Sequence, residues 1–357
     1  MHSDVLIIGG GQAGLAAAYF LAKHGLSYRI LDKGREIGES WKSRYDSLML
    51  FTPRNYSELP GLSLPGNPNG FPAKDEIAAA LKRYAEDHQL NIQLNTEVIA
   101  LKKIDDEFQA ETNRGSFTAR HVIVATGPFQ NPYIPPMSDQ LDRSVTQLHS
   151  AHYRNPADLQ PGSVLVVGCG NSGAQIAVEL SRSHRVVLSA GHRVNFMPLS
   201  IFGKSIFWWF DALGILNAPS DSRIGRMVRK RPDPVFGFEL KRLLKEESIM
   251  IKPKTIGADK RTVYFSDGTA MEAVNIIWAT GFRPDYGWLR IQDALDMDGK
   301  PLHERGVSPV KGLYYVGLPW QTSRNSALIG GVGRDAKAIA ENIRKNELSN
   351  SISGKRK

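Results

Sequence analysis

The sequence predicts an α/β protein with two parallel sheets, because one strand–loop–helix pattern occurs twice along its 357 residues. In each copy, an apolar run leads into a loop with the spacing Gly-x-Gly-x-x-Gly, and a helical stretch follows the loop. A later apolar run in each copy ends in the string Ala-Thr-Gly. One such glycine loop is a weak signal, but two in the same strand-to-helix context indicate two Rossmann-like units.

The first copy begins at the N-terminus. Residues 4–8 predict a strand, and a helix rich in alanine and leucine is expected to run to about His24. Between them lie Gly9, Gly11 and Gly14. In such a loop the first glycine permits a tight turn, the second lets the backbone approach a pyrophosphate, and the third lets the helix pack closely on the sheet. The loop therefore predicts a dinucleotide site.

Asp32 ends the next predicted strand, residues 28–31, and lies 23 residues after Gly9. A carboxylate at this position can accept hydrogen bonds from ribose hydroxyls. It would also repel the 2′-phosphate of NADP. The first site is therefore predicted to hold FAD or NAD.

The second copy begins with a predicted strand over residues 163–167. Its loop contains Gly168, Gly170 and Gly173, and its helix is expected to run to about Ser181. The same three glycine roles apply. This loop predicts a second dinucleotide site.

The second strand of this copy, residues 186–189, ends without a carboxylate. Counting 23 residues from Gly168 leads to Gly191, which His192 and Arg193 follow. No carboxylate would reject a 2′-phosphate here, and both neighbouring side chains could meet one. The second site is therefore predicted to hold the nicotinamide cofactor, accepting NADPH without excluding NADH.

The Ala-Thr-Gly strings close the two units. Residues 121–125 run into Thr126-Gly127, and residues 275–279 run into Thr280-Gly281. We therefore predict a discontinuous FAD-binding domain, residues 1–150 and 283–357, and an inserted NAD(P)H-binding domain, residues 158–280. Small antiparallel β additions are expected between the opening and the close of each unit.

Composition excludes several other classes. Cys169 is the only cysteine, so the sequence contains neither a disulfide framework nor the paired thiols of dithiol reductases. We find no pattern of metal ligands, and no apolar run of the roughly 18 residues that a membrane span requires. The first strand begins at the N-terminus without a signal peptide before it, so we expect a cytoplasmic protein.

The formal net charge of +9 raises the question of nucleic-acid binding. The excess cations are scattered, and no nucleic-acid motif is present. A positive field also suits a protein that binds two polyanionic dinucleotides. We therefore predict no nucleic-acid partner.

The chain resembles the bacterial flavin-containing monooxygenases, which are related to Baeyer–Villiger and plant indole-pyruvate monooxygenases. Besides both glycine loops and both Ala-Thr-Gly strings, the resemblance rests on residues 38–41, 71–74 and 312–317. It implies that NAD(P)H reduces FAD and that the reduced flavin adds dioxygen at C4a. The resulting peroxide would oxygenate a sulfide or an amine, or insert oxygen into a ketone. Substrate and dioxygen are then the expected partners.

Loop spacing and resemblance together give two sets of candidate cofactor residues. Trp41 is expected to lie against FAD, and Gln321 begins a segment that leads into a helix near the flavin ring. The predicted FAD set comprises Gly9, Gly11, Gln12, Ala13, Gly14, Asp32, Lys33, Gly38, Trp41, Val98, Ala125, Thr126, Gly127 and Gln321. The predicted NAD(P)H set comprises Gly168, Gly170, Asn171, Ser172, Gly173, Gly191, His192, Arg193, Thr280 and Gly281.

Two departures from the family pattern leave the activity open. The linker signature FxGxxxHxxxY/F survives only as His149 and Tyr153, with Arg143 and Val145 at its first two positions. Phe51, a candidate flavin-facing residue, stands where many members carry an asparagine that helps to hold the nicotinamide and the oxygenated flavin. An NAD(P)H-dependent reductase or oxidase therefore remains the alternative. No acid–base residue can be named.

One stretch fits none of these motifs. Residues 196–210 are rich in aromatic side chains, and a cluster of arginines follows between residues 223 and 231. A helical insertion over the cofactor cleft, an interface of a homodimer and a contact with a membrane surface are all compatible with this pattern.

Overall fold

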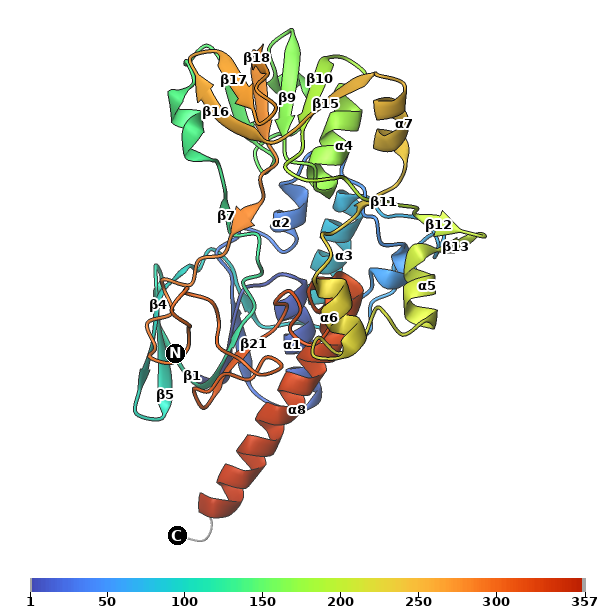
Figure 1. The fold of residues 1–357 in the computed structure, drawn as a ribbon. Coiled ribbons are helices and arrows are strands. Elements are labelled where there is room, and N and C mark those ends of the chain that lie inside the picture. Colours follow the sequence, from blue (N-terminus) through green and yellow to red (C-terminus); the bar gives the residue numbers. More distant parts are fainter. Residues whose placement is uncertain (1, 355–357) are drawn as a thin grey trace.

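The computed structural model describes residues 2–354, with side chains described for residues 2–349. The chain forms two lobes, and each is built around its own sheet (Figure 1). The predicted α/β fold, with two Rossmann-like sheets and small antiparallel additions, is confirmed.

The first sheet has seven strands in the order β3-β2-β1-β6-β5-β4, and β21 pairs with β6 in addition. The strands from β3 to β6 and β21 run parallel, whereas β5 and β4 add an antiparallel hairpin. The strands are β1 (His2–Ile8), β2 (Tyr28–Leu31), β3 (Ile92–Gln93), β4 (Val98–Ile104), β5 (Glu107–Thr112), β6 (Gly115–Val124) and β21 (Leu313–Tyr315).

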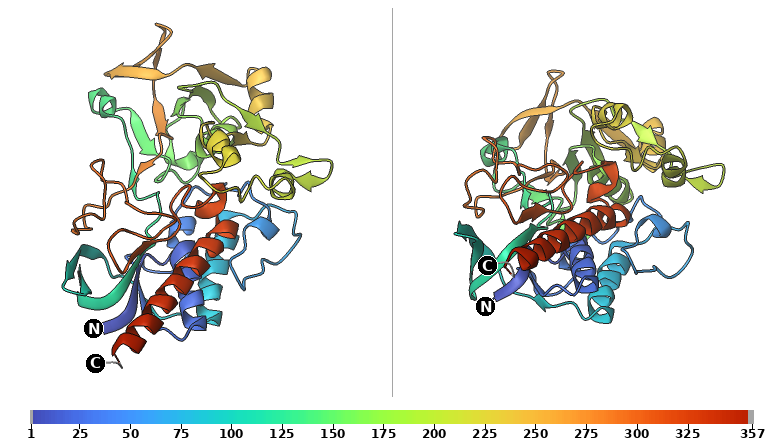
Figure 2. Two further views of the ribbon diagram at one scale, coloured as in Figure 1. Left: turned by 60° about the horizontal axis from the view of Figure 1, so that its bottom comes forward. Right: turned by 90° about the horizontal axis from the view of Figure 1, so that it is seen from below.

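Helices cover one face of the first sheet. There α1 (Gln12–Lys23) and α8 (Ile329–Gly354) lie side by side (Figure 2), and α3 (Lys74–Asp87) completes the layer. Small buried side chains such as Ala17 on α1 and Ala340 on α8 allow this close packing. The layer places the N-terminus of α1 at the carboxyl end of β1.

The second sheet has five parallel strands in the order β15-β10-β9-β19-β8. Helices α4 (Asn171–Leu180) and α7 (Glu239–Lys245) pack on one face, and a three-stranded antiparallel sheet packs on the other. The parallel strands are β8 (Thr146–His149), β9 (Ser163–Val167), β10 (Arg185–Ser189), β15 (Ile249–Lys252) and β19 (Asn275–Trp278). The antiparallel strands are β16 (Thr255–Asp259), β17 (Thr262–Phe265) and β18 (Ala270–Glu272).

The position of β8 corrects the predicted domain boundary at residue 150. β8 pairs with β19 of the second sheet, and Leu141 and Val145 just before it are buried in that lobe's core. Residues 146–149 are a short, partly polar edge strand, so they lack the apolar run that identified the other strands. The chain therefore enters the second lobe before residue 150.

Two chain crossings join the lobes. β7 (Asn131–Pro132) carries the chain into the second lobe, β20 (Phe282–Arg283) carries it back, and the two strands pair antiparallel between the lobes (Figure 1). Thr280, just before β20, also donates a hydrogen bond to the carbonyl oxygen of Tyr133, just after β7. This bond links the two crossings.

Residues 196–236 form an insertion in the second lobe that reaches toward the first. Its elements are β11 (Phe196–Met197), β12 (Ser200–Ile201), β13 (Lys204–Ser205), α5 (Ile206–Ala212), α6 (Arg223–Arg229) and β14 (Val235–Phe236). The sequence had left open whether this stretch is a helical insertion. It is one, with two short helices and a hairpin.

Within residues 2–354, no helix is long and apolar enough to cross a membrane. The same residues contain no group of three or more His, Cys, Asp or Glu side chains that could hold a metal ion.

Candidate dinucleotide sites and the cleft between them

The first glycine loop joins β1 to α1, and its glycines have different surroundings. A Cβ on Gly9 would lie 2.6 Å from the carbonyl oxygen of Ala125, and a Cβ on Gly14 would lie 1.9 Å from that of Gly9. Around Gly11, by contrast, no atom lies within 4 Å of the place that a Cβ would take. The loop is therefore packed tightly at both ends and leaves an open cradle in the middle.

The N-terminus of α1 opens onto this cradle. Gly11 is the N-cap, no side chain caps the first turn, and that turn contains no acidic residue. The first N–H groups of a helix lack partners inside the helix, and the helix dipole makes that end positive. A pyrophosphate in the cradle would meet both features. The residues present therefore fit a dinucleotide.

Asp32 lies beside the loop in a fixed orientation. One carboxylate oxygen accepts the N–H of Gly10 at 2.5 Å, and the other accepts the N–H of Gly34 at 2.7 Å. Because each oxygen can accept further bonds, the carboxylate keeps capacity for ribose hydroxyls. Trp41 also contacts the loop, since its Nε1 donates to Oε1 of Gln12 at 3.4 Å.

Four other residues of the predicted FAD set have different surroundings. Gly38 has a φ of +87°, and a Cβ there would lie 2.6 Å from the carbonyl oxygen of Ala78, so helix packing alone requires a glycine. Val98 begins β4, and Lys33 is exposed. Gln321 is buried, and its Nε2 has no hydrogen-bond partner among the described residues.

The second glycine loop repeats the first almost atom for atom. A Cβ on Gly168 would lie 2.4 Å from the carbonyl oxygen of Ala279, and one on Gly173 would lie 2.0 Å from that of Gly168. Gly170 has no atom within 4 Å of a Cβ position, and it is the N-cap of the uncapped helix α4. The second cradle therefore fits a pyrophosphate for the same reasons.

The two residues that follow Gly170, Asn171 and Ser172, contact other segments of the protein. The side chain of Asn171 donates to the carbonyl oxygen of Pro234 at 3.1 Å and accepts the N–H of Phe236 at 3.0 Å. It thereby fixes β14 of the insertion. Ser172 lies beside Tyr45 of the first lobe, whose hydroxyl donates to Oε1 of Gln175 on α4 at 3.0 Å, and burial raises the pKa of that tyrosine.

A cavity of about 580 Å³ opens beside the end of β10. Its lining includes Gly191, His192 and Arg193. These are the residues at which the sequence predicts that the adenosine end of the nicotinamide cofactor binds. Lys252 and Lys254, which the sequence analysis missed, line it too. Lys252 is the last residue of β15, the parallel neighbour of β10, and Lys254 follows that strand. Both could have been found if residues 249–252 had been recognised as a strand.

The Ala-Thr-Gly strings lie against the glycine loops and the crossings. Ala125 and Ala279 supply the carbonyl oxygens that contact the loops. Thr126 Oγ1 accepts from Gln130 at 3.0 Å, and the same amide donates to the carbonyl oxygen of Gly127 at 2.9 Å. Thr280 Oγ1 donates to the carbonyl oxygen of Tyr133.

His149, from the degenerate linker signature, is fully buried at the crossing. Its Nδ1 accepts the N–H of Ala151 at 3.1 Å, so Nε2 carries the proton and donates to the carbonyl oxygen of Gly281 at 2.9 Å. Burial lowers the pKa of His149, and the neighbouring His152 and Arg44 lower it further. The neutral imidazole of His149 therefore holds Gly281, the last residue of the second Ala-Thr-Gly string, in place through a hydrogen bond.

Phe51 lies in an aromatic cluster that joins the first lobe to the insertion. Its ring stacks on Phe236 at 4.5 Å between ring centroids and on Phe207 at 6.0 Å. Tyr56 of the first lobe joins the cluster and donates to Asp211 at 3.3 Å. The cluster places Phe51 at the contact between the lobes.

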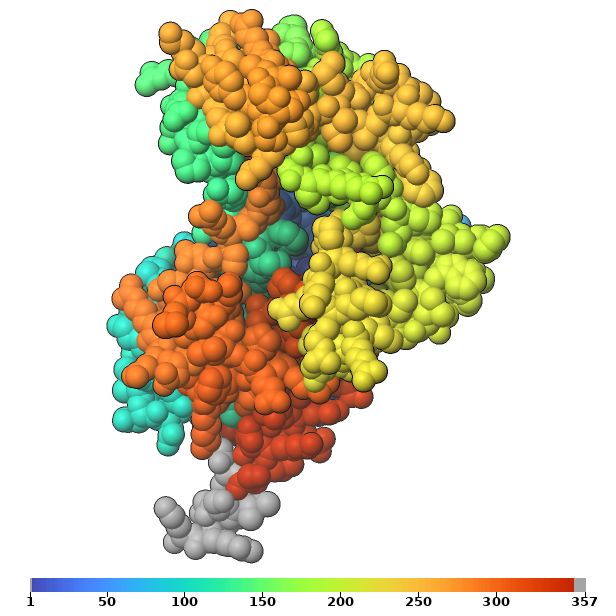
Figure 3. Space-filling model, in the orientation of Figure 1, coloured from blue at the N-terminus to red at the C-terminus, as the bar shows by residue number. Residues whose placement is uncertain are grey.

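Polar contacts also tie the insertion to the first lobe. Arg324 forms an ion pair with Asp233 at 2.8 Å, and Asn325 donates to Asn217 at 3.2 Å. In Figure 3 a hollow separates the lobes beside this insertion, and atoms of the dark-blue N-terminal part of the chain are visible inside it. The first glycine loop belongs to that part of the chain.

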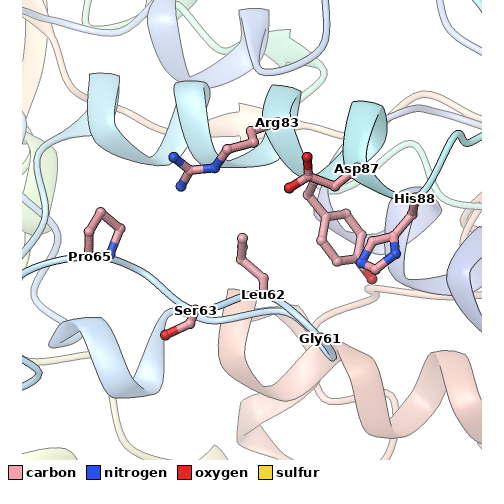
Figure 4. Close-up of a pocket in the computed structure, with 8 residues that line it drawn as sticks. Gly61, Leu62, Ser63, Pro65, Arg83, Asp87 and His88 are labelled. Carbon is pink, nitrogen blue, oxygen red and sulfur yellow. The ribbon is translucent and has the colours of Figure 1, made fainter.

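A second cavity, of about 380 Å³, lies away from both loops. It is formed by α3 and residues 61–65, and Arg83, Asp87 and His88 line it (Figure 4). None of its lining residues belongs to either predicted cofactor set.

Cys169 lies within the second glycine loop and is buried. Burial raises the pKa of its thiol to about 11, so the thiol stays protonated at neutral pH.

Comparisons with known proteins identify the family. Residues 6–196 match the model of the pyridine nucleotide-disulphide oxidoreductase family. A Geobacillus kaustophilus protein named "uncharacterized oxidoreductase CzcO-like" is 54% identical, and the match covers 95% of this chain and 98% of that protein. YUCCA3 of Arabidopsis thaliana, a probable indole-3-pyruvate monooxygenase, is 29% identical over 95% of this chain and 86% of its own.

A solved structure shows the same relationship. The flavin-containing monooxygenase from Stenotrophomonas maltophilia superposes with a TM-score of 0.81 at 28% identity, covering 97% of this chain and 99% of that chain. The chain is therefore an oxidoreductase that belongs to the pyridine nucleotide-disulphide oxidoreductase family, and it is similar to flavin monooxygenases of known structure.

Proposed function

We propose that this oxidoreductase binds FAD at the first glycine loop and NADPH or NADH at the second, and transfers one oxygen atom of dioxygen to a small substrate. The substrate would be a sulfide, an amine or a ketone. The observation that carries the proposal is the pair of open cradles at Gly11 and Gly170, each at an uncapped helix N-terminus, in a flavin monooxygenase family member.

FAD, when bound, supplies the redox chemistry: it accepts a hydride from the nicotinamide and activates dioxygen. The chain supplies binding and orientation. The first N–H groups of α1 would receive the pyrophosphate, and Asp32, already oriented by Gly10 and Gly34, would receive the ribose hydroxyls. Trp41, anchored to Gln12, would pack against the bound cofactor.

The second loop would hold the pyrophosphate of NAD(P)H, and the adjacent cavity would hold its adenosine end. Arg193 and Lys254 would attract the 2′-phosphate of NADPH, while Phe196 and Ile251 form an apolar wall for the adenine. Gly191 has no carboxylate, so it can neither repel the 2′-phosphate of NADPH nor bind the ribose diol of NADH. We therefore expect a permissive site.

The insertion would shield the reaction from water. Its aromatic cluster with Phe51 and its ion pair with Arg324 connect the lobes beside the hollow between them. Exclusion of water strengthens electrostatic interactions and suppresses side reactions. One molecule of NAD(P)H and one of dioxygen would be consumed for each oxygen atom transferred, and the second oxygen atom would leave as water.

A second candidate function is an NAD(P)H-dependent reductase or oxidase. Phe51 favours it, because an apolar ring stacked on Phe236 cannot donate the hydrogen bonds of an amide side chain. Electrons would then pass to another acceptor, or to dioxygen to give hydrogen peroxide.

The two functions differ in stoichiometry. The FAD-loaded protein would be given NADPH with panels of sulfides, amines and ketones, and NADPH consumption, oxygenated product and hydrogen peroxide would be measured together. Product formed in step with NADPH supports the monooxygenase. Peroxide formed in step with NADPH, regardless of added substrate, supports the oxidase and contradicts the main proposal.

A further inference from the structure

The insertion ends in a hairpin, β12–β13, that projects from the side of the molecule (Figure 1). Its turn exposes an aromatic side chain: Phe202 is 93% exposed, and Ile201 beside it is also exposed. Soluble surfaces commonly carry single exposed apolar residues, but clustering of large ones marks an interaction site. We propose that this hairpin and the start of α5 insert into the surface of an anionic lipid bilayer.

The local turn does not account for Phe202. The two residues between the strands, Phe202 and Gly203, have φ angles of +50° and +73°. A two-residue hairpin with positive φ at both positions strongly favours Asn-Gly or Asp-Gly, because other side chains are strained there. Phenylalanine at the first position is both strained and exposed to water. Its presence therefore points to a contact outside the chain.

Residues of α5 extend the apolar tip and give it the pattern of a membrane interface. Trp208 is 37% exposed, and the Nζ of Lys204 lies 5.5 Å from its ring centroid. Trp209 packs edge-on against Trp208 and donates from its indole to the carbonyl oxygen of Ile201 at 3.1 Å, which fixes the helix to the hairpin. Tryptophan and lysine beside an apolar tip suit the boundary between headgroups and acyl chains.

Positive charge lies in the same insertion. Residues 196–236 contain six cations and three carboxylates. The arginines of α6 (Arg223, Arg226 and Arg229) are exposed, and within the described part of the chain they form no ion pair. Met227 and Ile224 are exposed between them. Figure 3 shows the hairpin, α5 and α6 as neighbouring parts of one face.

The shape and the charge of the insertion together favour a lipid surface over a protein as the partner of the hairpin tip. The tip is convex, so a rigid protein partner would need a matching pocket, whereas lipid headgroups can part around it. The surplus of cations complements anionic headgroups, and each basic residue near such a surface adds attraction. The combination is that of an interfacial anchor that lies in the membrane surface and does not span it.

Vesicle sedimentation with the purified full-length protein tests the proposal. The probes are vesicles of phosphatidylcholine alone and of phosphatidylcholine mixed with phosphatidylglycerol, each at low and high salt. We expect the wild-type protein to sediment with the anionic vesicles and to be released by salt. Absence of sedimentation, or equal sedimentation with both vesicle types, would overturn the proposal.

The variant Phe202→Asn removes the apolar tip and places the residue that the turn prefers, so the fold should be preserved. We expect its partition coefficient on anionic vesicles to fall about tenfold, as the loss of one buried phenylalanine implies. Met297→Ser, which removes a fully exposed apolar residue in the other lobe, serves as the control and should bind as the wild type does.

Unchanged binding by Phe202→Asn would overturn the proposal. A dimer that forms without lipid and disappears in Phe202→Asn would also overturn it, because the tip would then dock on a second copy of the chain. Analytical ultracentrifugation without vesicles detects that outcome.

Discussion

Replacing Gly11 with alanine should remove FAD binding and leave the fold intact. The added Cβ would meet no protein atom within 4 Å, and Gly11 has a φ of −75°, which any residue adopts. As an N-cap, alanine is less favourable than glycine, and we expect a cost to folding below about 1 kcal/mol. The methyl group would instead occupy the cradle in which we place the pyrophosphate.

The effect on FAD affinity follows from the lost hydrogen bonds. A hydrogen bond to a charged group contributes about 1.5–3 kcal/mol. If the displaced pyrophosphate loses two bonds to the first N–H groups of α1, the loss is about 3–6 kcal/mol. That corresponds to a rise in the dissociation constant of roughly a hundredfold to ten-thousandfold.

Two matched variants separate binding from folding. Gly14→Ala would place a Cβ 1.9 Å from a backbone oxygen, so it should destabilise the protein itself, by about 1–3 kcal/mol or more. Gly170→Ala is the equivalent of Gly11→Ala in the second loop, and it should keep FAD while weakening NADPH. Flavin content, thermal unfolding and NADPH titration distinguish the three. A folded Gly11→Ala protein with the FAD affinity of the wild type would refute the reasoning.

Three further predictions concern the cleft, the cavity and the crossing. Phe51→Asn should retain FAD and change the ratio of hydrogen peroxide to product, and an unchanged ratio would remove Phe51 from the reaction site. The wild-type kcat/KM values for NADPH and NADH should lie within about tenfold of each other. Lys254→Ala should lower the kcat/KM for NADPH about fivefold, and Gly191→Asp should shift the cofactor preference toward NADH. A wild-type preference above about a hundredfold would contradict the permissive site. Because the pKa of His149 is lowered below its usual value of 6.5, the stability it contributes is complete above that pH and is lost as the pH falls through its folded-state pKa. His149→Gln should therefore flatten the decline in melting temperature between about pH 8 and pH 5, and an equal slope in both proteins would count against this role.

The fold was predictable because its main signals are local. Each glycine loop follows a buried strand and begins a helix, so sequence neighbours alone fix the unit. The assignment of Gly168 and Gly9 to tight turns needs no knowledge of distant residues, although the contacts that require them come from Ala279 and Ala125.

Features that depend on distant pairing were missed. Lys254 reaches the predicted cofactor cavity because β15 runs parallel to β10, and nothing in the intervening residues announces that pairing. β8 joins the second sheet as a four-residue edge strand, too short for a periodic pattern. The stacking of Phe51 on Phe236 likewise depends on how the insertion folds back on the first lobe.

The central claim is that an oxygen atom from dioxygen enters the substrate at the expense of NAD(P)H. The most direct measurement uses isotope-labelled dioxygen with the FAD-loaded protein, NADPH and a substrate that stimulates NADPH oxidation, and follows the label by mass spectrometry. We predict one labelled oxygen atom in each product molecule and a product yield equal to the NADPH consumed. An unlabelled product, or label recovered only in hydrogen peroxide, would contradict the account.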